Sequence, residues 1–190
     1  MLRGIALTGS IAEISSFEWA YDGCKLTTMA TTIRALTLIS FLFLGAAGQE
    51  PKPLADFSLP RPNGQTVSSQ DLKDNIVVLD FWATWCAPCV SEIPAFNKLQ
   101  AKYRSRGVRV IGLAVQSGWA SDVRKFIARH RMRYTVLVGN DQTVADFEAI
   151  GFPTTYLVAP GWKVYKKYTG PEGNKVAEIA RDIERLLKAK

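Results

Sequence analysis

The chain contains few of the residues that build structural disulfides and metal sites. Its 190 residues include three cysteines and one histidine. A structural zinc site needs four nitrogen or sulfur ligands, and only Cys24 and His130 lie outside the one cysteine pair, so no metal is expected. The longest apolar run is shorter than the roughly 20 residues of a membrane span. No interleaved basic and aromatic motif indicates nucleic-acid binding, and no cofactor motif is present.

The most informative segment is the cysteine pair in Trp85-Cys86-Ala87-Pro88-Cys89. It follows the apolar run 76–82, which is typical of a buried strand, and it precedes a helical pattern. Cysteines at such a junction lie on the first helical turn, where free backbone N–H groups and the helix dipole favour a thiolate. A thiolate beside a second thiol exchanges disulfides, so this context favours redox chemistry over half of a zinc site.

Residues 80–89 resemble the active-site strand and helix start of the thioredoxin superfamily. Pro94 and the loop 151–157 match two further positions of that superfamily, the helix kink and the cis-proline loop. The resemblance covers the chain from about Leu54 to its end. It implies an α/β thioredoxin-like sandwich, with a central mixed sheet flanked by helices and an N-terminal β-hairpin extension.

The hairpin pattern of residues 57–67 and the carboxylate of Glu92 resemble the exported TlpA/ResA-like branch of this superfamily. Three positions depart from other branches. Thr154 stands where haem-maturation oxidoreductases usually carry glutamate, Pro88 where the DsbA type has histidine, and Ala83 where a peroxiredoxin needs threonine. The resemblance therefore implies an exported thiol:disulfide oxidoreductase.

Four residues are the expected catalytic group. Cys86 is expected to attack as the more exposed thiolate, and Cys89, one turn deeper, is expected to resolve the mixed disulfide. Asp80 interrupts an apolar strand, so we expect it to be buried and to accept a proton from Cys89. Glu92 is a second candidate for this role, with an exposed helix position as the alternative.

Three residues are expected to bind the substrate. Pro153 is inferred to be cis, which turns the Phe152 backbone toward an extended client segment. Trp85 is expected to shield the disulfide and form part of the docking surface. Two other function classes stay open: a non-catalytic peptide-binding envelope protein and a peroxide-reducing thiol enzyme.

The resemblance also implies partners and a location. Clients would be disulfide-containing proteins of the bacterial envelope or periplasm, with apocytochrome c, and so cytochrome c biogenesis, as one client class. Electrons would come from a membrane-embedded donor of the DsbD/CcdA type, and we expect a monomer.

The first 48 residues are expected to lie outside the folded domain. Residues 29–48 have the layout of a secretory signal peptide, with a start at Met29 and cleavage near Gly48 or Gln49. An uncleaved membrane tether is the alternative. Residues 1–28 precede this signal and are interpreted as a non-native upstream extension. Residues 49–190 form the thioredoxin-like domain.

Within that domain the pattern predicts a hairpin, a capped turn, and alternating strands and helices. The hairpin spans residues 55–67, and Ser69 is expected to cap the turn 70–73. The predicted strands are 76–82, 108–115, 135–138, 155–159 and 164–168, and the predicted helices are 86–106, 121–131, 144–150 and the C-terminal segment. The net charge of +7 is concentrated near residues 124–133, where a solvated helix face is favoured over a docking patch.

Overall fold

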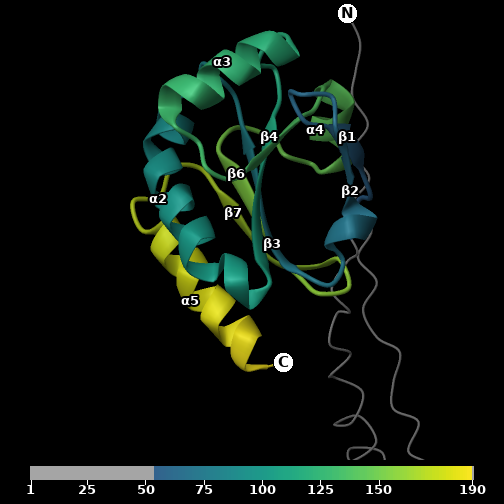
Figure 1. The fold of residues 1–190 in the computed structure, drawn as a ribbon. Helices are drawn as coiled ribbons and strands as arrows, with labels where there is room; N and C mark the ends of the chain where they lie inside the picture. Colours follow the sequence, from purple (N-terminus) through teal and green to yellow (C-terminus); the bar gives the residue numbers. More distant parts are fainter. Residues whose placement is uncertain (1–53, 190) are drawn as a thin grey trace, which may run out of the picture. The chain divides into compact units, whose positions relative to one another are not determined.

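The computed structural model describes residues 54–189, which form a mixed sheet with helices on both faces and a hairpin beside it (Figure 1). The strands are β1 (Ser58–Pro60), β2 (Thr66–Ser68), β3 (Ile76–Trp82), β4 (Val108–Ala114), β5 (Thr135–Val138), β6 (Thr154–Ala159) and β7 (Lys163–Thr169). The helices are α2 (Ala87–Tyr103), α3 (Ala120–His130), α4 (Asp141–Asp146) and α5 (Lys175–Lys188), with 3₁₀ turns η1 (Ser69–Leu72) and η2 (Arg104–Arg106). Within this range no helix is long and apolar enough to cross a membrane.

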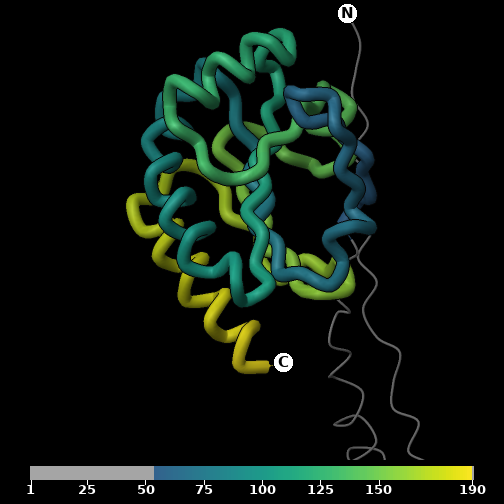
Figure 2. The backbone as a smooth tube through the Cα atoms, in the orientation of Figure 1, coloured from purple at the N-terminus to yellow at the C-terminus, as the bar shows by residue number. Residues whose placement is uncertain are grey.

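The main sheet has the strand order β5-β4-β3-β6-β7. β3, β4 and β5 are parallel, whereas β6 is antiparallel to β3 and β7 is antiparallel to β6. Parallel neighbours need crossover connections, which α2 and α3 provide. The backbone tube in Figure 2 shows the β1–β2 hairpin on the side of the sheet opposite to α2 and α5. The central mixed sheet, flanking helices and N-terminal hairpin predicted from the sequence are confirmed.

The central strand β3 separates two apolar cores, and all seven of its residues are buried. Alternate residues from Ile76 to Trp82 pack with α2, α3 and α5. The residues between them pack with the hairpin and with the segment around α4. Because side chains alternate across a strand, Asp80 points to the face that α2 and α5 cover. Cys86 and Cys89 belong to the core on that same face.

The long helix α2 begins directly after Cys86, which is its N-cap residue. Pro94 lies inside the helix, and Gly107 follows η2 with a φ of 79°, a left-handed conformation that favours glycine. The predicted helix 86–106 is therefore confirmed, with a 3₁₀ last turn.

Two local predictions are wrong. Ser68, rather than Ser69, caps η1, because its hydroxyl accepts the Gln70 N–H while Ser69 is buried against Phe57. The predicted helix 144–150 lies earlier, because Asn140 caps α4 through the backbone N–H of Thr143. The segment after α4 leaves helical geometry at Glu148, whose φ is 49°. The predictions for residues 1–48 lie outside the described residues.

Candidate active site

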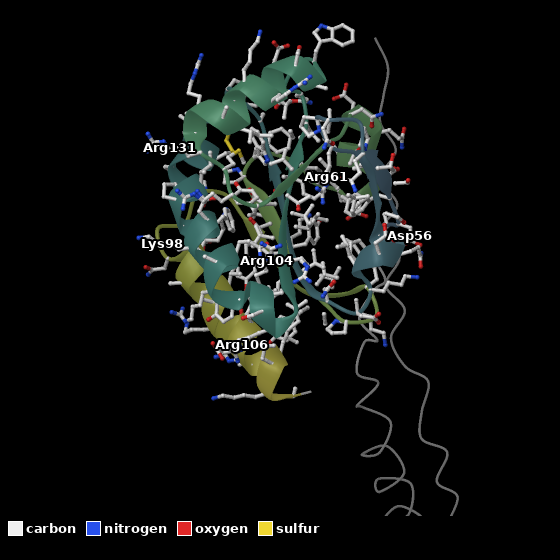
Figure 3. All side chains as sticks on the ribbon, viewed as in Figure 1. Asp56, Arg61, Lys98, Arg104, Arg106 and Arg131 are labelled. Atoms are coloured by element: carbon white, nitrogen blue, oxygen red, sulfur yellow. A yellow bond between two sulfur atoms is a disulfide. The ribbon has the colours of Figure 1, made fainter. Side chains whose placement is uncertain are left out.

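A disulfide joins Cys86 and Cys89 at the start of α2, with their Cα atoms 5.3 Å apart. The Sγ of Cys86 accepts the backbone N–H of Cys89 at 3.3 Å. A thiolate at this atom would keep the same donor, in addition to the positive end of the helix dipole. Figure 3 shows the disulfide, in yellow, near the upper end of α2 in that view.

The predicted difference in exposure between the two cysteines is wrong. Both are 4% exposed, because both sulfurs lie in the core that α2 and α3 cover. The distinction between them therefore rests on helix position: only Cys86 is the N-cap, where the unpaired N–H groups of the first turn point.

Asp80 is buried, 2% exposed, on the face of β3 that lies beneath α2. Its Oδ1 accepts a hydrogen bond of 2.8 Å from the hydroxyl of Thr155, the residue opposite it on β6. Burial raises the pKa of Asp80 to about 7, although the positive charge of Lys175 and the Thr155 hydrogen bond lower it. The carboxyl group is therefore divided between its two protonation states near neutral pH.

Glu92 forms an ion pair with Lys175, whose side chain is completely buried at the start of α5. Lys175 Nζ lies 2.7 Å from Glu92 Oε2, and among the described residues neither atom has a further hydrogen-bond partner. Burial raises the pKa of Glu92, and the contact with Lys175 lowers it. The alternative of an exposed helix position for Glu92 is wrong, because only 11% of its side chain is accessible.

Lys175 is the site residue that the sequence analysis missed. Its charge acts on both Asp80 and Glu92, so the three groups form one electrostatic unit. Burial raises the pKa of the Tyr134 phenol, and the nearby charges of Asp80 and Glu92 raise it further. A lysine at the start of an amphipathic helix is normally solvated, so no sequence pattern marked Lys175 as buried.

An exposed apolar rim lies beside the disulfide. The ring of Trp85, 64% exposed, lies 5.9 Å from the ring of Phe152, and its Nε1 donates to the carbonyl of Gln116. The Phe152–Pro153 peptide bond is cis, as predicted. Ile150, two residues before Phe152 in the chain, is 90% exposed and lies outside the helix that the sequence predicted for it.

No group of three or more histidine, cysteine or acidic residues within residues 54–189 is arranged to hold a metal ion. The described site contains two sulfurs, two carboxyl groups and one buried ammonium group.

Replacing Lys175 with methionine should destabilise the fold by about 3–5 kcal/mol, because Glu92 would keep a buried charge without its partner. Urea unfolding measures this change. The double substitution Lys175→Met/Glu92→Gln should recover most of the loss. The control Lys125→Met removes a lysine whose side chain is 78% exposed and should cost less than about 1 kcal/mol. If Lys175→Met and Lys125→Met lost the same free energy of unfolding, a structural role for the buried Lys175–Glu92 pair would be contradicted.

Comparison with known proteins places the described geometry among known redox proteins. The profile of the AhpC/TSA family matches residues 51–167. The chain is 33% identical over 138 residues to the thioredoxin-like protein YneN of Bacillus subtilis, covering 72% of this chain and 81% of that protein. It is 31% identical over 136 residues to the thiol-disulfide oxidoreductase ResA of the same strain. This match covers 70% of this chain and 75% of that protein. The fold also matches the crystal structure of a Chlorobium tepidum protein that was provisionally named thiol:disulfide interchange protein DsbE. The two chains are 30% identical with a TM-score of 0.68, and the match covers 73% of this chain and 98% of that one.

Proposed function

The chain belongs to the AhpC/TSA family and is a thiol:disulfide oxidoreductase of thioredoxin-like fold, and from this premise we propose that it reduces client disulfides in the bacterial cell envelope. The observation that carries the proposal is the position of the cysteine pair. Cys86 caps α2, and the Asp80 carboxyl group, with a pKa of about 7, points to the same face of the sheet. A non-catalytic peptide-binding role would require neither feature.

The proposed reaction has two exchange steps. The Cys86 thiolate attacks one sulfur of a client disulfide, a mixed disulfide forms, and the other client sulfur leaves as a thiolate. Cys89 then loses its proton and attacks Cys86. The mixed disulfide breaks, the second client sulfur leaves, and the enzyme pair becomes the disulfide while the client gains two electrons.

Asp80 is the proposed proton acceptor for the second step. Cys89 is buried, so its proton needs a nearby base. A base is most effective when its pKa lies near the working pH, and burial brings the pKa of Asp80 to about 7. Glu92 and Lys175 act as positioning residues in this proposal, since their charges set the field around Asp80.

The proposed client-docking surface is the apolar rim of Trp85, Ile150 and Phe152. Exposed aromatic and apolar side chains beside a reactive group bury area when a client segment docks. The neighbouring residues Phe152 and Pro153 are the proposed contact for an extended client strand.

Export, the electron donor and the client identity are further parts of the proposal. The signal-like segment 29–48 supports export, with cleavage preferred over a retained anchor. A membrane-embedded donor of the DsbD/CcdA type would reduce the disulfide again after each turnover. Apocytochrome c is a client class that only the family resemblance suggests.

The insulin reduction assay with dithiothreitol tests this function. The wild-type chain should accelerate the appearance of turbidity, and Cys86→Ser/Cys89→Ser should not. Hydrogen peroxide consumption by the reduced protein should stay at the rate of a free thiol. Peroxide consumption without insulin reduction would favour the peroxide-reducing alternative, and neither activity would favour the peptide-binding one.

A further inference from the structure

A cavity of about 720 Å³ lies at the β5 edge of the sheet, between the β1–β2 hairpin, α2 and α3. None of the cysteines, carboxylates or rim residues of the active site lines it, and Tyr134, whose phenol lies near Asp80 and Glu92, is the one residue that the two sites share. Five arginines from five different segments line the cavity: Arg61, Arg104, Arg109, Arg124 and Arg133. Figure 3 labels two of them, Arg61 from the turn after β1 and Arg104 from the end of α2. Among the described residues lining the cavity, Asp71 is the only acidic one.

Among the described residues, these arginines lack the acidic partners that other arginines have. Arg106 lies 2.8 Å from Glu184, and Arg185 lies 2.6 Å from Asp182. Over residues 54–189, by contrast, none of the five cavity arginines forms an ion pair. The carboxylate of Asp71 already accepts the backbone N–H of Ser68 in the cap of η1. The cavity therefore holds a large excess of positive charge.

Arg61 provides a second and independent observation. Its Nε is buried and has no hydrogen-bond partner among the described residues. A buried N–H group without an acceptor is costly, and a charged one more so. Because Nε itself is closed off from the cavity, a ligand oxygen would contact the terminal nitrogens of the Arg61 guanidinium instead.

We propose that this cavity binds a small soluble polyanion through its phosphate or carboxylate oxygens. Guanidinium groups bind such oxygens with two parallel hydrogen bonds, and five arginines line one concave space. One of them, Arg109, already donates from Nη1 to the carbonyls of Arg104 and Val108, which leaves four without such a bond among the described residues. The volume lies within the about 300–1,000 Å³ that is typical of small-molecule sites. A flat membrane surface would not reach the walls of a concave cavity. This inference does not rest on the proposed client reduction.

The structure also refines the basic segment noted in the sequence. Arg124 and Arg133 line the cavity, whereas Lys125 and Arg129 do not, although all four residues are exposed. The exposed segment therefore contributes two of its arginines to the cavity. The same distinction supplies a matched control, because cavity and non-cavity arginines can be replaced with equal loss of net charge.

Isothermal titration with sodium tripolyphosphate at low salt tests the proposal on the full chain. One equivalent should bind to the wild type. Arg124→Gln/Arg133→Gln should weaken binding by about tenfold or more, since each change removes charge-assisted hydrogen bonds. The control Arg129→Gln/Arg181→Gln removes the same charge from exposed positions outside the cavity and should change affinity by less than about twofold. Arg61→Gln alone should also weaken binding by about tenfold.

Three results would overturn the proposal. Equal loss in both double variants would mean that net charge alone attracts the anion. No measurable binding to the wild type would remove the site. Binding of phosphatidylglycerol vesicles or of an acidic peptide that depends on Arg124 and Arg133, without tripolyphosphate binding, would assign these arginines to a macromolecular partner. Insulin reduction should be unchanged in every variant, so this test and the test of client reduction can fail separately.

Discussion

Replacing Cys86 with serine is expected to abolish disulfide exchange, because no attacking thiolate remains at the start of α2. Replacing Cys89 with serine is expected to preserve the first attack and to trap mixed disulfides with clients, because no thiol remains to resolve them. Non-reducing electrophoresis with mass spectrometry of the trapped species measures both effects.

Cys24→Ser is the matched control in this series, and it should change neither exchange nor trapping. This control is made in the full 190-residue chain, because Cys24 is proposed to be absent from the exported protein. If mixed disulfides with clients accumulated in Cys86→Ser and not in Cys89→Ser, the assignment of the attacking and resolving thiols would be reversed. Faster alkylation of Cys89 than of Cys86 near neutral pH would give the same contradiction.

Replacing Asp80 with asparagine is expected to slow resolution at neutral pH by about 10²-fold, the lower range for a lost general base. The first attack by Cys86 should stay largely intact, because only the second step takes a proton from a buried thiol. In the wild type, resolution should rise with pH through about 7 as Asp80 ionises, and this inflection should be absent in the variant. Stopped-flow tryptophan fluorescence over a pH series measures the rate, with Trp82 and Trp85 as reporters.

Glu92→Gln tests the second carboxyl group in the same assay. It should slow resolution less than Asp80→Asn, because Glu92 is already paired with Lys175. The apparent pKa values should belong to the coupled groups rather than to single residues. Unchanged resolution rates in Asp80→Asn/Glu92→Gln would mean that water takes the proton and that both carboxyl groups are structural.

Asp80 should also lower the stability of the oxidised protein in alkaline solution. Its pKa rises from 3.8 to about 7 on folding, so the stability that its protonation provides is fully present below about pH 4. That stability is lost as pH rises through about 7. Asp80→Asn should therefore be more stable than the wild type at about pH 8, by up to about 4 kcal/mol in the free energy of unfolding.

The sequence was sufficient to predict the sheet, the long helix and the redox pair. The wholly apolar run of β3 and the helical spacing in α2 are local patterns, and tertiary packing does not override them. The position of α4 was not predictable from apolar spacing, because the capping side chain of Asn140 decides where that helix begins.

The part of the site that the sequence could not provide depends on long-range contacts. Lys175 and Glu92 are far apart in the chain, and only the packing of α5 against α2 brings them together. The cavity arginines come from five separate segments, so no continuous motif could indicate them. Burial of an individual charged residue is a property of the assembled fold, whereas Asp80 could be predicted because its strand neighbours are all apolar.

The direction of electron flow is tested most directly by the reduction potential of the Cys86–Cys89 pair against glutathione. Strong oxidants such as DsbA owe their potential of about −120 mV to a stabilised reduced form. Here the buried carboxyl groups of Asp80 and Glu92 should disfavour a nearby thiolate, which favours the disulfide form. We predict a potential nearer to the about −270 mV of thioredoxin, typical of a reductant. A value near that of DsbA would contradict client reduction and would make the protein an oxidant.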